Sequence, residues 1–307
     1  MDRPIIVHSV PVNKDVCGGI KVHYQLAMLE QEMGYDSFIV YKENDAPSIK
    51  WFPHTCTEYT LNHFKYLLEE RKQQVFLLIG WEEPSSLDVL PALHKVAYIQ
   101  GHAFFRNVNE YKGAKLWFNS NYVKNVCGVD GQVIPPYLDE SFLNKERGIW
   151  TYFKHRHKLL VQARKQGKEA WDKVAYHIHS SVLDRLDVTV LEDVDASLFK
   201  EALKAIDIFF AHSFPEGFGL PPLEAMGLGT LVVGYTGGGG SDFMKNHHNC
   251  FIAPDGDHIG IAKHLTNILL AKYNNIPHVL RNAHETANSY NKENTKKLLT
   301  TWLEGNT

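Results

Sequence analysis

Two glutamates at a fixed spacing are the residues of this sequence best suited to chemistry. Glu216 and Glu224 lie eight positions apart, in a stretch with glycines and a proline pair that follows an apolar run over residues 206–210. A strand, a glycine-containing loop and a proline-started helix together place backbone N–H groups at the carboxyl end of the strand. Open α/β sheets bind ligands at that edge. The pattern predicts an anion site with Glu216 at the loop and Glu224 in the first turns of the helix.

Both glutamates also have a simpler interpretation. Glu216 would then be a solvated loop residue, and Glu224 a first-turn acid that interacts favourably with the helix dipole. Core packing explains neither of them, so the two interpretations stay open at this point.

A basic cluster precedes this stretch. Residues 141–176 contain nine lysines and arginines against three acids, although the whole chain has a formal net charge of −3. Such a surplus needs an anionic partner or solvent, and solvent accounts for most of these side chains. Arg164 and Lys168 differ because they follow directly on the predicted strand over residues 158–163 and open a helix. Lys165, between them, is a substitute for either.

Three positions in the N-terminal half also lie where a ligand could bind. Gly18 and Gly19 stand between the first apolar run and the helix that follows it, where glycine lets the backbone approach a ligand. His102 follows the apolar run over residues 96–100 at the same predicted edge. A plain tight turn and a structural histidine are the alternatives for these positions.

The elements that must position these residues are short apolar runs alternating with helical patterns, which predict parallel sheets covered on both faces. The expected strands of the N-terminal half cover residues 4–10, 37–41, 75–81, 96–100 and 115–119. Those of the C-terminal half cover residues 158–163, 187–191, 206–212, 230–235 and 250–253. The expected helices cover residues 196–205, 259–273 and 291–303, and a further one begins after Gly19 and ends at Gly34.

A double proline at residues 135–136 divides the chain. Neither a helix nor a central strand tolerates this pair, so we expect the domain linker over residues 133–139. The predicted organisation is a Rossmann-like domain over residues 1–138, a second one over residues 139–290, and a C-terminal helix over residues 291–307 that could pack back on the first domain.

The bulk composition excludes several classes of protein. The 307 residues are 44% hydrophobic and 22% charged, which is ordinary for a folded protein of about two domains. The formal net charge of −3 gives no indication of nucleic-acid binding. The four cysteines are scattered without metal-ligand spacing, and no stretch approaches about 18 apolar residues. We therefore expect a cytoplasmic protein, with peripheral membrane contact left open and the oligomeric state unspecified.

The stretch Glu-Gly-Phe-Gly-Leu-Pro-Pro-Leu-Glu-Ala-Met, residues 216–226, resembles the Glu-x7-Glu motif of the GT4-type retaining glycosyltransferases (glycosyl transferases group 1). The order of the surrounding segments is also similar over most of the chain. The resemblance implies the α/β GT-B fold, in which two Rossmann-like domains face each other across a cleft. It implies an enzyme that moves a sugar from a nucleotide-diphosphate sugar to an acceptor hydroxyl. The first domain would lie on the acceptor side and the second would bind the nucleotide sugar.

The resemblance also implies roles for the residues singled out above. Glu224 would bind the donor ribose, and Glu216 would lie beside the donor sugar. Arg164 and Lys168 would neutralise the donor diphosphate, with Lys165 as the alternative lysine. The remaining expected donor contacts are His102 and the backbone of Gly217, Phe218, Gly219, Leu220, Gly18 and Gly19.

One departure from the family pattern affects the identity of the donor. The glycines at residues 237–240 run into Ser241, Asp242 and Phe243, where the family usually has an apolar pair and a glutamate. The glycines still suit a loop that approaches phosphate, with Ser241 as a helix N-cap.

Several alternatives remain at this point. A nucleotide-sugar epimerase and a non-catalytic sugar-nucleotide-binding protein are rival functions for the same fold. A metal-dependent site would use Asp193 and Asp195, which are also placed to cap a helix. We expect no metal or other cofactor, and a nucleotide sugar and an unidentified glycan, lipid or protein acceptor as partners.

Overall fold

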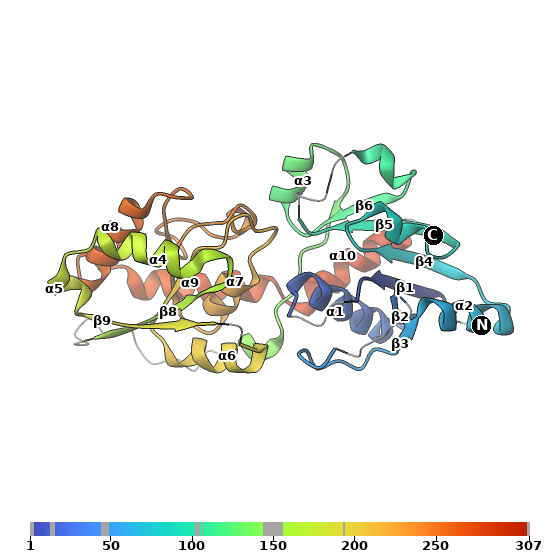
Figure 1. Cartoon of the computed structure of the whole chain (residues 1–307), viewed down its shortest axis with the longest axis horizontal. Helices are drawn as coiled ribbons and strands as arrows, with labels where there is room; N and C mark the ends of the chain where they lie inside the picture. The colour runs from blue at the N-terminus through green and yellow to red at the C-terminus, as the bar shows by residue number, and fades with distance from the viewer. Residues whose placement is uncertain are drawn as a thin grey trace. The chain divides into compact units, whose positions relative to one another are not determined.

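The computed structural model describes residues 3–12, 16–43, 49–101, 105, 107–143, 156–192 and 194–305. The chain divides into two compact units, Met1–Pro135 and Pro136–Thr307. Each unit is built on one sheet with helices packed against it (Figure 1). No helix among the described residues has the length and apolar character needed to cross a membrane.

The N-terminal unit contains a seven-stranded sheet in the order β3-β2-β1-β4-β5-β6-β7. All neighbouring strands pair in parallel. The strand order reverses between β1 and β4, which is the type of position where open α/β sheets bind ligands. The strands are β1 (Ile5–Val10), β2 (Asp36–Tyr41), β3 (Glu58–Thr60), β4 (Val75–Gly80), β5 (Ala92–Ile99), β6 (Lys115–Phe118) and β7 (Gln132–Val133), and the helices are α1 (Gly18–Glu32), α2 (Leu61–Arg71) and α3 (Asn121–Cys127).

The C-terminal unit contains a five-stranded parallel sheet in the order β12-β11-β10-β8-β9. Here the order reverses between β8 and β10, so the loops after these two strands flank the switch point. The strands are β8 (His157–Gln162), β9 (Leu186–Leu191), β10 (Ile208–Ala211), β11 (Leu231–Gly234) and β12 (Phe251–Ile252), and the helices are α4 (Gly167–Tyr176), α5 (Ser180–Leu183), α6 (Ala196–Ala205), α7 (Leu220–Gly227), α8 (His258–Leu269), α9 (Ile276–Ser289) and α10 (Lys292–Glu304).

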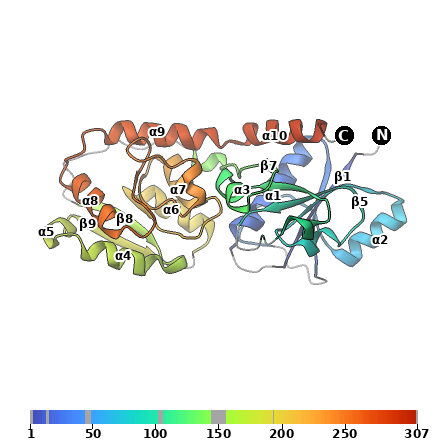
Figure 2. The same ribbon diagram turned by 90° about the horizontal axis from the view of Figure 1, so that it is seen from above.

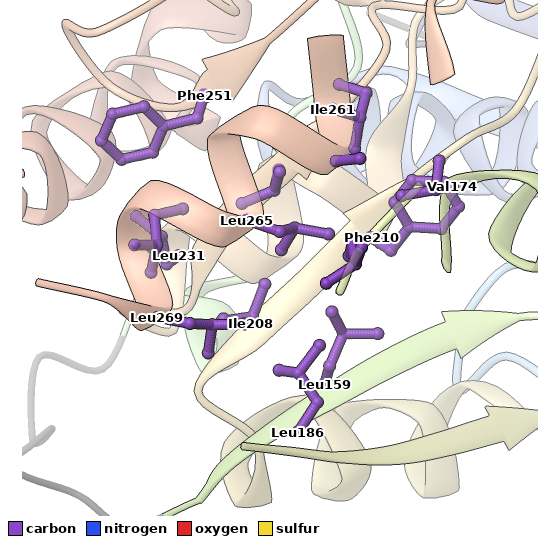
Figure 3. Close-up of a cluster of buried hydrophobic side chains, with 14 of the residues drawn as sticks. Leu159, Val174, Leu186, Ile208, Phe210, Leu231, Phe251, Ile261, Leu265 and Leu269 are labelled. Atoms are coloured by element: carbon purple, nitrogen blue, oxygen red, sulfur yellow. The ribbon is translucent and has the colours of Figure 1, made fainter. Parts of the chain in front are cut away.

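Alternating side chains of the central strands bury both faces of this second sheet. Leu159 and Phe210 face a core shared with α4 and α8 (Figure 3), whereas Leu160 and Phe209 face a second core shared with α6 and α7. The two views show α4 and α6 on opposite sides of β8 (Figures 1 and 2). A strand buried on both faces must be apolar throughout, which is why these strands are visible in the sequence as continuous apolar runs.

The ten predicted strands are all present, and most of their ends agree within two residues. The helix over residues 196–205 is confirmed with its predicted bounds, and Gly34 follows α1 with a φ of 94°. Two strands were not predicted, β3 and β7, which have three and two residues. Both lie at sheet edges, where a short segment becomes a strand only through its single neighbour. The helix expected over residues 259–273 ends at Leu269.

Candidate functional site

The turn after β8 has an unusual backbone. Lys165 and Gln166 both have left-handed conformations, with φ values of 52° and 64°. This region costs a residue other than glycine roughly 1–2 kcal/mol. Strain of this kind persists only where surrounding contacts hold it, and it is common at functional sites. The turn lies at the switch point of the sheet and includes Arg164.

The strained turn brings Lys165 to Glu216. The Lys165 Nζ atom lies 2.7 Å from Glu216 Oε2 and 3.2 Å from the carbonyl oxygen of Pro215. The two side chains are 48% and 26% exposed, and an ion pair this accessible to water contributes little to stability. A cation and a carboxylate from the two loops that flank the switch point are thus held together.

A glycine-rich loop after β11 supports Glu216 from the other side. The Glu216 backbone donates to the Gly237 carbonyl at 2.7 Å and accepts from the Gly239 N–H at 2.9 Å. A Cβ atom on Gly237 would lie 2.0 Å from the Ser213 carbonyl oxygen, and one on Gly239 would lie 2.2 Å from that of Gly217. Only glycine permits this contact between the two loops.

The expectation for Ser241 is wrong. Ser241 lies inside the short 3-10 turn Gly239–Asp242 and caps no helix. The turn begins at Gly239, whose backbone packs closely against that of Gly217. The chain then forms one short 3-10 turn and no α-helix follows it directly.

Glu224 is the fifth residue of α7 and is 6% exposed. It therefore lies beyond the first turn, where the effect of the helix dipole on an acid has fallen off. The interpretation of Glu224 as a first-turn acid is not supported. A carboxylate this buried is rare unless its polar atoms have partners.

The start of α7 has fewer backbone donors than a typical helix. Gly219 precedes the helix with a φ of 95°, and Pro221 and Pro222 lie in its first turn. Proline has no N–H, so two donors of that turn are missing. The Phe218 side chain is 3% exposed and packs on Phe243, with the ring centroids 5.5 Å apart. Only its backbone is therefore placed to take part in a donor site.

The other predicted cation, Lys168, has a local partner. Its Nζ atom lies 2.7 Å from Asp172 Oδ2, one turn further along α4, and both side chains are 57% exposed. The hydrogen bond to Asp172 raises the pKa of Lys168. The structure thus brings Lys165, and not Lys168, into contact with Glu216.

In the N-terminal unit, Gly18 and Gly19 are the first two residues of α1. A Cβ atom on Gly19 would lie 2.6 Å from Cη2 of Trp81, and the Gly19 carbonyl accepts a hydrogen bond from Gln100 Nε2 at 3.1 Å. Close packing against Trp81 therefore explains why position 19 is glycine, without any ligand. His102 lies outside the described residues.

The sequence prediction missed a buried polar group at the carboxyl edge of the first sheet. Glu82, which follows β4, is 4% exposed and its Oε1 atom accepts the Gln100 backbone N–H at 2.9 Å. Burial raises the pKa of Glu82 to about 7. The Gln100 carbonyl accepts from Asn119 Nδ2 at 2.8 Å. The available signal was an acid directly after a buried strand.

Of the two candidate metal-binding aspartates, Asp195 has another role in the structure. Its Oδ1 atom accepts the Leu198 N–H at 2.8 Å, so it is the N-cap of α6. Asp193 lies outside the described residues.

Comparison with protein families gives one match. Residues 167–296 match the family model described as glycosyl transferases group 1. The matched segment contains Glu216 and Glu224 and begins after the turn that carries Arg164 and Lys165. No curated protein matches the sequence.

Solved structures match over almost the whole chain. Sucrose-phosphate synthase from Thermosynechococcus elongatus has a TM-score of 0.74 at 14% identity, with 99% of each chain covered. HepE from Anabaena, in complex with UDP and glucose, has a TM-score of 0.75 at 12% identity, covering 99% of this chain and 100% of that one. A glycosyltransferase from Rickettsia africae has a TM-score of 0.75 at 13% identity, with 99% of each chain covered. The predicted GT-B fold is thereby confirmed.

Proposed function

We propose that this protein is a retaining glycosyltransferase that moves a sugar from a nucleotide-diphosphate sugar to a hydroxyl of a glycan, lipid or protein acceptor. The observation that carries the proposal is the contact of Lys165 with Glu216 at the switch point of the C-terminal sheet. Glu216 lies in the segment that matches the group 1 transferases. The structure of HepE with UDP-glucose, a neighbour of the same fold, supports a nucleotide sugar as the donor.

In this proposal the charged side chains of the site bind different parts of the donor. Arg164 and Lys165 face the diphosphate, and Lys165 exchanges its contact with Glu216 for a phosphate oxygen when the donor binds. Glu216 then faces the sugar, and Glu224 binds the ribose hydroxyls. Charge-assisted hydrogen bonds of these kinds are the strong ones in proteins. The backbone of residues 217–220 completes the donor site, while Lys168 is the alternative to Lys165.

The proposed chemistry is substitution at the anomeric carbon with retention. The bond from this carbon to the leaving diphosphate oxygen breaks, and a bond to the acceptor oxygen forms on the same face. The proton of the acceptor hydroxyl passes to the leaving diphosphate. Fixed cations that meet the charge developing on that diphosphate lower the barrier, because their stabilisation is larger in the transition state than in the ground state.

The test is a panel of nucleotide sugars, screened first for thermal stabilisation and then for turnover with hydroxyl acceptors. Ligands that bind the folded state raise its apparent stability. We expect release of a nucleoside diphosphate and, by NMR, a product with the anomeric configuration of the donor. Inverted product would contradict retention. Interconversion of free nucleotide sugars would indicate an epimerase, and binding without turnover a non-catalytic protein.

We also place the protein in the cytoplasm. All four cysteines are free thiols, and free thiols are typical of a reducing compartment. A peripheral contact with a membrane is compatible with a lipid acceptor.

Replacing Glu224 with alanine is expected to weaken nucleoside diphosphate binding by roughly ten- to a hundredfold, because charge-assisted hydrogen bonds to the ribose are lost. The measurement is titration calorimetry with the nucleoside diphosphate of the preferred donor and with its 2′,3′-dideoxy analogue. The wild-type protein and the variant should bind the analogue equally. Unchanged affinity for the normal ribose in a folded Glu224→Ala protein would remove Glu224 from the ribose site.

Activity is expected to need no divalent metal, because Arg164 and Lys165 supply the counter-charge that a metal would otherwise provide. Purified enzyme should keep most of its rate in excess chelator. Asp195→Ser removes the carboxylate but keeps a good N-cap for α6, so this variant should also stay active. Loss of the rate in chelator, with recovery on adding Mg²⁺ or Mn²⁺, would show that a metal is required.

A further inference from the structure

His212 lies directly after β10 and has no role in the site described so far. It is 8% exposed, and its ring stacks on that of Phe210 with the centroids 5.8 Å apart. Its Nε2 atom lies 2.8 Å from the backbone carbonyl oxygen of Arg164. A carbonyl oxygen can only accept, so Nε2 carries the hydrogen and donates it. This bond joins the end of β10 to the turn after β8.

The ring of His212 also packs against the residue that ends this turn. A Cβ atom on Gly167 would lie 2.3 Å from His212 Nε2 and 1.7 Å from the Gln162 carbonyl oxygen. Position 167 therefore admits only glycine, and the imidazole fills the space beside it. The turn over residues 164–166 is thus bounded by strand β8 on one side and by the ring of His212 on the other.

This turn is the strained segment of the site. Lys165 and Gln166 have left-handed φ values, and conformations of this kind persist only when neighbouring groups hold them. The hydrogen bonds of the turn include one from His212 to the Arg164 carbonyl and one from the Gly167 N–H to the Ala163 carbonyl at 3.2 Å. The second is a local bond that any similar turn could form. The first comes from the residue that follows a different strand, β10, and joins the backbone of the turn to the end of that strand.

We propose that His212 is a positioning residue, whose Nε2–H bond to the Arg164 carbonyl holds the 164–166 turn in the conformation that presents Arg164 and Lys165 to phosphate. The inference rests on the proposed function, which assigns the diphosphate to this turn. His212 itself touches no substrate in this scheme. It acts through the backbone of Arg164. Its loss should therefore weaken the binding of every ligand that carries phosphate and leave the binding of ligands without phosphate unchanged.

Two substitutions separate the hydrogen bond from the packing of the ring. His212→Phe keeps a flat ring over Phe210 but has no N–H, whereas His212→Gln loses the ring but keeps an amide N–H that can reach the Arg164 carbonyl. For His212→Phe we expect nucleoside diphosphate binding to weaken by about five- to tenfold, the value of one lost hydrogen bond. Affinity for the unphosphorylated nucleoside should stay unchanged. His212→Gln should bind both ligands nearly as well as the wild-type protein.

The control is His278→Phe, which changes an exposed histidine of α9 and should leave both affinities unchanged. If His212→Phe and His212→Gln bind the diphosphate equally, whether both normally or both weakly, the N–H has no positioning role and the inference is wrong. An equal loss for nucleoside and diphosphate in His212→Phe would indicate general damage to the site and would also overturn it.

Hydrogen exchange of the ligand-free protein keeps this test separate from the proposed function. The Gly167 N–H, which is bonded to Ala163, should exchange faster in His212→Phe than in the wild-type protein and should be protected again in His212→Gln. Unchanged exchange in both variants would contradict the inference. If exchange follows the expected pattern but the wild-type protein binds no nucleoside diphosphate, the positioning of the turn stands and the proposed function fails.

Discussion

Alanine at Arg164 or at Lys165 should lower turnover by roughly 10²–10³-fold, the loss that follows removal of one preorganised group from a developing charge. The structure motivates this expectation through the position of the turn at the switch point and the 2.7 Å contact of Lys165 with Glu216. Arg164→Ala keeps the backbone carbonyl that accepts from His212. The substitution therefore removes the guanidinium without removing the bond that positions the turn.

The loss is expected mainly in the rate because the additional charge on the diphosphate develops during the reaction and is absent from the bound donor. Negative charge grows on the leaving diphosphate as the anomeric bond breaks, so a fixed cation stabilises the transition state more than the bound donor. The kcat value should fall more than the affinity for the donor. Steady-state kinetics with the preferred donor, together with calorimetric affinity for its nucleoside diphosphate, separates these two effects.

Lys168→Ala is the matched control, since it removes a lysine only three positions from Lys165. Lys168 is paired with Asp172 on the surface of α4, and exposed pairs of this kind contribute about 0–1 kcal/mol. We expect turnover close to that of the wild-type protein. A large loss in Lys168→Ala with normal turnover in Lys165→Ala would assign the phosphate role to Lys168.

The second large effect is expected in the pH dependence of stability. Glu82 has an ordinary pKa of 4.5 in the unfolded chain, and burial raises it to about 7 in the folded protein. Its contribution to stability is therefore complete below pH 4.5 and is lost as the pH rises through about 7. Integrated over this window, the shift corresponds to about 3 kcal/mol of the free energy of unfolding.

Glu82→Gln should remove this dependence, because the amide keeps an oxygen that can accept the Gln100 N–H but does not ionise. The measurement is urea unfolding of the full chain between pH 5 and 8, followed by tryptophan fluorescence, with Trp81 next to the substituted residue. The free energy of unfolding of the variant should rise relative to that of the wild-type protein as the pH increases. The slope is decisive, since the added amide hydrogens contribute equally at every pH.

Glu83→Gln supplies the control for this measurement. Glu83 is the next residue in the chain, and its side chain is 58% exposed, so Glu83→Gln replaces a carboxylate that the fold does not bury. The free energy of unfolding of Glu83→Gln should therefore change with pH in the same way as that of the wild-type protein. Parallel curves for the wild-type protein and Glu82→Gln would show that the Glu82 carboxylate is ionised in the fold without cost.

The sequence was sufficient to predict the two sheets and the position of the motif at a strand end. A central parallel strand is buried on both faces and is therefore apolar where it crosses the core, as the middle of β8 (Leu159, Leu160 and Val161) and the whole of β10 are. The Glu-x7-Glu stretch is equally local, because its strand, loop and helix follow one another directly. The short edge strands β3 and β7 escaped prediction because they consist of so few residues.

The charges and partners at the site were decided only by tertiary structure. Lys165 meets Glu216 across 51 positions of the chain, and it does so because its left-handed backbone turns it toward the loop after β10. Lys168 instead follows helical geometry and meets Asp172 four positions away. Composition and spacing cannot distinguish these two lysines, since the backbone angle that separates them is held by His212 from another strand. For the same reason the sequence shows Glu82 only as an acid after a strand, while its burial and its bond from the Gln100 N–H depend on residues distant in the chain.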